Sequence, residues 1–177
     1  MKRNAFSMIE LVFVIVILGV LAAVAVPKFV SSRADAQVAT LRSDIATVLK
    51  TVPSRVFAEN LDVGNKPTGT SSSGTTFTNW GEWIVDTAGL DKTKWKINGT
   101  GIEPIYQFNG NNSQGCGVVI TINPSQANKT PDITFDPGAL GKAAPASSNS
   151  LCKGLKASYP SGSKRVIPLG STGSIKF

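Results

Sequence analysis

The feature that most constrains this chain is an unbroken apolar run near its N-terminus. Residues 11–26 read LVFVIVILGVLAAVAV, and the stretch 6–26 has only Ser7 and Glu10 as polar exceptions. About 20 apolar residues are enough for a helix to cross the hydrocarbon core of a bilayer. Because two basic residues precede the run, we expect the N-terminus to remain cytoplasmic and the rest of the chain to lie outside the cytoplasm.

A cleaved secretory signal peptide is one interpretation of this segment. It accounts for the basic start, the apolar stretch and a small-residue cleavage site at Ala23-Val24-Ala25. Two features argue against it. Glu10 lies at the edge of the run, where a carboxylate at membrane depth costs about 2.5–3.5 kcal/mol, and helical patterning continues past the cleavage site. We therefore expect the apolar run to stay in the mature protein.

Beyond Pro27 the apolar residues recur with helical spacing. The spacings are 4, 3, 4, 3 and 4, which define one face of a helix, and the residues are Ala34, Val38, Leu41, Ile45, Val48 and Val52. We expect this stripe to pack against the C-terminal domain rather than to form a seam between subunits. Gly19 and Pro27 should loosen or kink the helix, and Pro53 should end or bend it.

The remainder of the chain predicts a small β domain. Residues 64–79 are mostly Gly, Ser, Thr, Asn and Pro, which indicates an exposed loop. Short β-compatible runs separated by turn residues follow at 83–86, 95–98, 105–108, 118–122, 133–135, 166–169 and 174–177. We therefore expect an α+β fold in which a small antiparallel sheet of three to five strands packs on the stripe of the long helix.

The composition excludes much catalytic chemistry. The 177 residues contain no histidine and only two cysteines, so His-based general acid–base catalysis, His-ligated metals and a four-thiolate metal site are ruled out. Asp132 and Asp136 are too few for a calcium site and are interpreted as turn residues. We predict no enzymatic activity, no metal and no cofactor.

The C-terminal part is basic. From Pro137 onward there are six basic residues and no acidic one, namely Lys142, Lys153, Lys156, Lys164, Arg165 and Lys176. A solvated basic face is the preferred interpretation. Nucleic-acid binding is only weakly indicated, because Tyr159 is the sole ring nearby on which a base could stack.

The first ten residues carry a more specific pattern. The basic stretch Lys2-Arg3-Asn4-Ala5 is followed by Phe6, then by Glu10 four positions later, and then by the apolar run. This arrangement resembles the class III signal of type IV prepilins and type II secretion pseudopilins. The resemblance implies cleavage between Ala5 and Phe6 by a prepilin peptidase that also N-methylates Phe6. Ala5 stands where that family usually has glycine.

The resemblance also implies an assembly mechanism. Phe6 and Glu10 are expected to pair between neighbouring subunits, which wait in the inner membrane until an assembly platform extracts them into a filament. Many type IV pilins close a C-terminal loop with a disulfide. Cys116 and Cys152 form the one possible pair, in a domain expected outside the cytoplasm where disulfides persist.

The expected organisation is a cleaved leader (1–5), a transmembrane and filament-core helix (6–30), an amphipathic half of the helix (31–60), a loop (61–80) and a β domain with a disulfide loop (81–177). The expected function is that of a structural subunit, a self-assembling pilin of a type IV pilus, a type II secretion pseudopilus or a DNA-uptake filament. We expect it in the inner membrane with its C-terminal domain in the periplasm, and then in a filament. The alternative is a monomeric binding protein, membrane-anchored or secreted, that uses its basic face to bind an anionic ligand.

Overall fold

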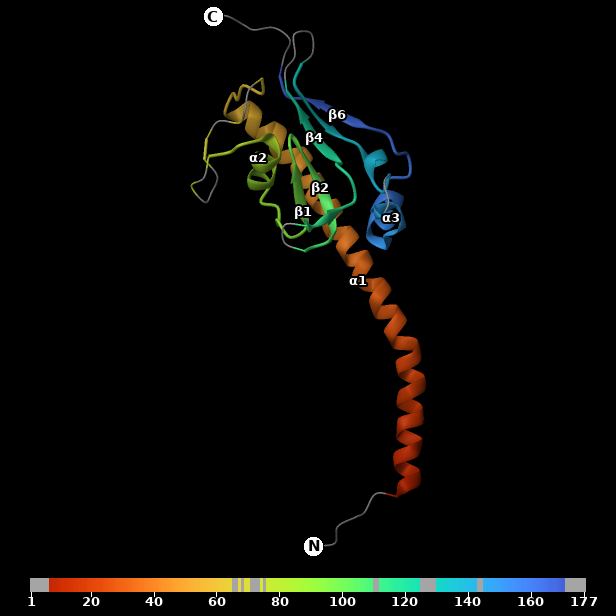
Figure 1. Cartoon of the computed structure of the whole chain (residues 1–177). Helices are drawn as coiled ribbons and strands as arrows, with labels where there is room; N and C mark the ends of the chain where they lie inside the picture. The colour runs from red at the N-terminus through yellow and green to blue at the C-terminus, as the bar shows by residue number, and fades with distance from the viewer. Residues whose placement is uncertain are drawn as a thin grey trace, which may run out of the picture.

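One long helix, α1 (Met8–Ala58), runs from the N-terminal end of the molecule into a small domain (Figure 1). The structure is a computed structural model that describes residues 7–64, 67, 69–70, 74, 76–109, 112–124, 130–142 and 145–170, with the backbone alone for 24–32. At 1.5 Å per residue, the 51 residues of α1 extend over roughly 76 Å. Its red N-terminal part projects away from the domain, and its orange part lies against it (Figure 1).

The helix continues through both of its prolines. The prediction allowed for an end or a bend at Pro53, and the helix does not end there: it extends to Ala58. Buried Val52 and Val56 flank Pro53 and pack into the domain, which keeps the chain helical although one backbone hydrogen bond is lost. The helix ends where Asn60 adopts a positive φ of 47° and the Leu61 N–H donates to the Val56 carbonyl.

The sheet of the domain is antiparallel throughout, as predicted. Its main path has the order β1-β2-β4-β5-β6, and β3 pairs with β2 beside this path. The six strands are one more than the upper limit of the prediction. They are β1 (Trp95–Asn98), β2 (Gly101–Gln107), β3 (Gln114–Gly115), β4 (Ile120–Asn123), β5 (Asp132–Phe135) and β6 (Arg165–Pro168).

The predicted strand at 83–86 is wrong, because these residues lie in a second helix, α2 (Trp80–Thr87). The Asn79 side chain accepts a hydrogen bond from the Glu82 N–H and caps the helix. The spacing of Trp80, Trp83 and Ile84 then puts all three on one buried face. The predicted strand at 174–177 lies outside the described residues.

Three further helical segments, two of them single 3-10 turns, were not predicted from the sequence. Asp136 caps η2 (Pro137–Ala139), η3 (Ala146–Ser148) follows, and α3 (Ser150–Ala157) packs against α1. The Asn149 side chain caps α3 by accepting from the Leu151 N–H at 2.9 Å. Leu151 and Leu155, four residues apart, then face the core.

The predicted stripe of α1 lies in the core of the domain. Leu41, Ile45, Val48 and Val52 are at most 3% exposed, and Val56 extends the stripe by another turn. They pack into one cluster with the tryptophans of α2 and the inner face of the sheet. This confirms the prediction that the stripe packs on the C-terminal domain.

The loop after α1 is less exposed than predicted. Among the described residues between α1 and α2, Pro67 and Phe77 are buried, and Val63 is only 2% exposed. An isolated β-bridge joins Thr70 to Thr76. The apolar residues of this Gly/Ser/Thr-rich segment therefore anchor it to the core cluster.

Candidate assembly surface

The N-terminal half of α1 has no partner within the domain. Every side chain described between Met8 and Ala23 is exposed, and twelve large apolar ones between Met8 and Leu21 have exposed fractions from 42% to 85%. A helix that is apolar on all sides needs apolar surroundings on all sides. This segment is therefore the part of the molecule that most needs another molecule around it.

In the described part of the chain, no helix meets the length and hydropathy required of a membrane span.

Glu10 lies in the first turn of α1. Its carboxylate accepts a hydrogen bond from the Ser7 backbone N–H at 2.9 Å. The expected cleavage residues, Ala5 and Phe6, lie outside the described residues, so the expected pairing of Glu10 with a neighbouring Phe6 amine stays a prediction. Ser7 directly follows Phe6 in the chain, which places the Glu10 carboxylate one residue from the expected new N-terminus.

The two expected loosening positions both lie inside α1. A methyl group added at Gly19 meets no atom within 4 Å, so this position is open on the outside of the helix. Pro27 lies in the continuous helical backbone, in the stretch for which side chains are not described. That they kink or loosen the helix stays a prediction.

A disulfide joins Cys116 to Cys152, the pair expected from the sequence. The Cα atoms are 5.4 Å apart, the two positions are separated by 36 residues, and both side chains are buried. Cys116 follows β3 and Cys152 lies in the first turn of α3. The disulfide therefore fastens α3 to the sheet and encloses β4 and β5.

Glu103 supports the Cys116 end of the disulfide loop. This residue is 8% exposed, and its carboxylate accepts a hydrogen bond from the Gly117 N–H at 3.2 Å and lies 3.7 Å from the Lys96 amine. A methyl group on Gly115 would lie 2.3 Å from the Glu103 carboxyl carbon. Glycine at 115 thus lets the buried carboxylate approach the backbone that leads to the disulfide.

Asp136 caps η2, which agrees with its interpretation as a turn residue, whereas Asp132 is the first residue of β5 and not a turn residue. Asp132 accepts hydrogen bonds from the Asn123 amide at 2.7 Å and the Thr134 hydroxyl at 2.8 Å. Asp136 accepts from the Gly138 N–H at 2.9 Å and forms an ion pair with Lys164 at 3.1 Å. The described residues contain no cluster of three metal-ligating side chains.

The basic residues of the C-terminal part are exposed, except that Lys176 lies outside the described residues. Tyr159, the ring considered for base stacking, instead packs edge-on against Phe135 with ring centroids 4.9 Å apart. Burial raises the pKa of the Tyr159 hydroxyl above its ordinary value, although nearby Arg42 opposes the shift. A half-buried ring held in this way is a poor stacking platform for a base.

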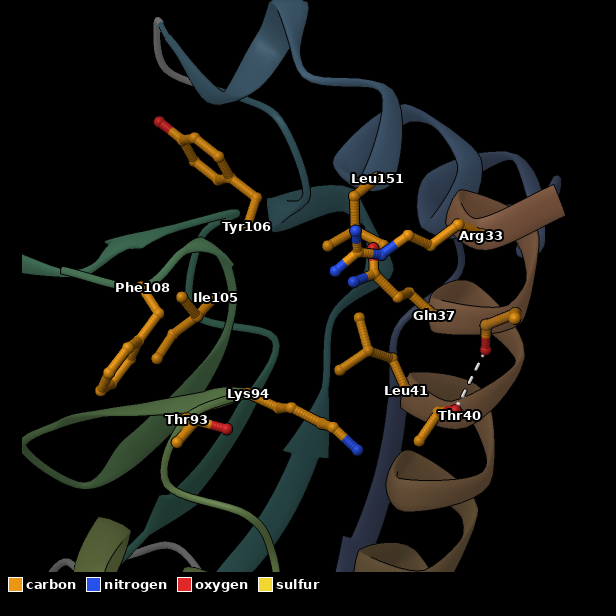
Figure 2. A pocket seen from close by; sticks show the side chains of 11 residues that line it. Arg33, Gln37, Thr40, Leu41, Thr93, Lys94, Ile105, Tyr106, Phe108 and Leu151 are labelled. Carbon is orange, nitrogen blue, oxygen red and sulfur yellow. Dashed lines mark hydrogen bonds between the residues drawn. The ribbon is translucent and has the colours of Figure 1, made fainter. Parts of the chain in front are cut away.

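The structure also shows a groove that sequence reasoning missed. It lies between α1 and the ends of β1 and β2, with a volume of about 610 Å³. Arg33, Leu41, Lys94 and Phe108 are among its lining residues, as Figure 2 shows. Its lining residues come from four separate segments of the chain (33–41, 93–94, 105–108 and 151), so no local sequence pattern could predict it.

Two comparisons with known proteins agree with this arrangement. The family model described as the prokaryotic N-terminal methylation motif matches residues 1–26. The type IV narrow pilus major component PilA5 of Thermus thermophilus is 39% identical over 85 residues, which cover 44% of this chain and 72% of that protein. No solved structure matches the chain. The methylation motif at the start of α1 and the relative matched over most of its length show that this chain belongs to the type IV pilin family, a family of structural subunits and not of enzymes.

Proposed function

We propose that this chain is the subunit of a type IV pilus and assembles through the N-terminal half of α1. The observation that carries the proposal is the exposure of twelve large apolar side chains between Met8 and Leu21, directly after a methylation motif. Fully burying one such side chain is worth about 1.5–3 kcal/mol. Since each is already partly covered by its own helix, covering the whole segment yields on the order of 10 kcal/mol or more. That is ample to hold a subunit in a bilayer or in the core of a filament.

Processing comes before assembly in this proposal. A prepilin peptidase cleaves between Ala5 and Phe6 and N-methylates Phe6, and residues 6–30 hold the subunit in the inner membrane. An assembly platform then moves the subunit into the growing filament. The methylation motif at residues 1–26 supports these steps.

Glu10 sets the register between subunits in this proposal. An unpaired carboxylate at membrane depth costs about 2.5–3.5 kcal/mol. An ammonium of a neighbouring Phe6 at 4 Å attracts it by about 4 kcal/mol at an effective dielectric constant of 20. The two terms are similar in size, so the pair favours the one register in which it forms and contributes little net stability.

A pilus is preferred over a secretion pseudopilus or a DNA-uptake filament. The relative from Thermus thermophilus is a pilus component, and the disulfide loop is the kind that many type IV pilins carry. The half-buried Tyr159 further weakens the case for nucleic-acid binding.

The experiment that tests this proposal is mass analysis of the N-terminal peptide from native membranes and from sheared filaments. We expect a chain that begins with N-methylated Phe6 in both. A chain that begins at Met1 or Val26 contradicts the proposal, and it favours an unprocessed anchor or a secreted monomer, respectively.

A pair of variants tests the role of Glu10. Glu10→Ala should still be processed and inserted but should lose filaments. Asp35→Ala is the matched control, because it removes an exposed carboxylate from the same helix outside the apolar segment, and it should assemble normally. Normal filament yield from Glu10→Ala contradicts the pairing.

A further inference from the structure

The groove beside α1 is basic and partly apolar. Leu41, Ile105 and Leu151 lie at its base and are at most 8% exposed, so its accessible apolar surface is mainly Phe108, which is 57% exposed. Arg33 reaches in from α1, and Lys94 extends toward α1 from the opposite side (Figure 2). Lys94 lies 4.0 Å from Asp91 in an exposed pair, which contributes little. Among the described residues, Arg33 has no ion-pair partner, so both cations can bind a carboxylate from outside.

The C-terminal end of α1 has complementary properties. Phe57, in the last turn, is 61% exposed, and Glu59 and Asp62 are exposed beside it in sequence. Arg55 pairs with Glu59 at 2.8 Å, with the side chains 36% and 47% exposed. An exposed pair of this kind is worth about 0–1 kcal/mol, so Glu59 can exchange its partner at little cost. This end therefore presents an aromatic side chain flanked by carboxylates.

The two surfaces lie at opposite ends of the domain along one axis. Arg33 and Gln37 line the groove, and Phe57 lies 24 and 20 residues further along the same helix. At 1.5 Å per residue the separation is about 30–36 Å. A second copy that is displaced by this distance parallel to α1, and that lies beside the first so that the two helices do not overlap, brings its groove level with the Phe57 end of the first.

Such a contact joins two different surfaces and not two copies of the same one. A heterologous contact leaves one groove and one Phe57 end free at the two ends of any assembly, so it builds open filaments and not closed dimers. The charges agree with this polarity, because the groove contributes cations and the other end contributes carboxylates. Two like ends would bring equal charges together.

We propose that the groove between α1, Lys94 and Phe108 receives the C-terminal end of α1 from a second copy of this chain. Phe57 of one copy packs against the exposed Phe108 of the next, and Glu59 moves from Arg55 to the Arg33 and Lys94 of that next copy. The inference rests on the proposed filament function. It adds a contact between globular domains to the packing of the apolar helices.

Photocross-linking in filaments tests this contact. The aromatic photocross-linker p-benzoylphenylalanine is placed at position 57 of the full chain, and filaments sheared from cells are irradiated and analysed by mass spectrometry. We expect dimers in which position 57 is joined to peptides containing Arg33 to Leu41 or Ile105 to Phe108. The matched control places the same label at Val166, which is 56% exposed but lies on β6, and should give no groove peptide.

The outcomes separate the contact from the proposed function. Filaments whose position 57 links elsewhere, or to nothing, overturn the contact and leave the filament function standing. Absence of filaments from the unmodified chain overturns the function itself. If the label at position 57 prevents assembly, the reciprocal label at position 108 decides: links to residues 55–62 of another copy support the contact, and their absence from intact filaments overturns it.

Discussion

The two halves of α1 are built from similar residues and meet opposite surroundings. In the half from Met8 to Ala23 every described side chain is exposed, whereas in the half from Leu41 to Val56 one stripe is almost completely buried. The difference lies in the pattern: the first half is apolar on every face, and the second has one apolar face and one polar face. A single domain can cover a stripe, but it cannot surround a helix. The striped half therefore serves folding, and the continuous apolar half is the part that the proposed function assigns to assembly.

The largest expected effect is on the stability of the domain that covers the striped half. Both cysteines of the disulfide lie in this domain, and neither lies on α1. Replacing both Cys116 and Cys152 by serine opens a loop of 36 positions and should cost about 4 kcal/mol of unfolding free energy on the chain-entropy model. Denaturant unfolding under oxidising conditions measures this. The same titration with added reductant should make the parent chain resemble the variant. An unchanged midpoint in the variant contradicts the prediction.

A matched pair of truncations tests the comparison directly. Ile45 is 2% exposed and Ile15 is 55% exposed on the same helix. Ile45→Ala should lower the free energy of unfolding by about 3 kcal/mol, because it leaves a cavity in the core. Ile15→Ala should leave unfolding of the domain unchanged and should reduce filament yield. Similar effects of the two substitutions on unfolding break the comparison.

A smaller effect concerns a hydrogen bond between side chains of the striped half of α1 and β1. The Trp95 indole N–H donates to the Asp44 carboxylate at 2.8 Å. Asp44→Ala leaves this N–H without its acceptor on a tryptophan that is 1% exposed, and should cost roughly 1.5–2 kcal/mol. Asp35→Ala, on the same helix but at an exposed position, should stay within about 0.5 kcal/mol of the parent. Thermal unfolding compares the two variants.

The smallest expected effect is a pH dependence at the start of α2. The Glu82 carboxylate accepts hydrogen bonds from the Thr78 N–H and hydroxyl, both at 2.8 Å, and these bonds lower the pKa of Glu82 below its ordinary value of 4.5. A depressed pKa in the folded state stabilises the fold above pH 4.5, and the stabilisation is lost as the pH falls through the folded value. Glu82→Gln should therefore reduce the loss of thermal stability between neutral pH and a pH below 4.5. An identical acid dependence in both proteins argues against the assignment.

Sequence patterns predicted the parts of the fold that depend on long periodic signals. These parts are the stripe of α1, the antiparallel sheet on it and the class of the N-terminal segment. Each is marked by a residue pattern that is compatible with few other structures. The failures concern short segments. The run at 83–86 has strand-like composition, and only the Asn79 cap and the spacing of Trp80 and Trp83 mark it as a helix.

Other elements were missed for equally local reasons. β2 was predicted only from residue 105, and its first half was missed because it begins at Gly101 and contains Pro104, a residue that argues against a strand interior. α3 was missed because it contains Gly154, which lowers helix propensity. Glycine at this position lets α3 pack closely on α1, since a methyl group there would lie 3.2 Å from the Val38 side chain. The groove at Phe108 could not be predicted from the sequence, because it is formed by segments that are distant in the chain.

The connection between α1 and the domain has a mechanical consequence. The disulfide joins α3 to the sheet, and neither cysteine lies on α1. A tensile load carried along the N-terminal half of α1 therefore reaches the domain as shear on the contacts of Leu41 to Val56, about four helical turns of side-chain packing. Because these contacts run parallel to the pull, they share the load and do not open one after another.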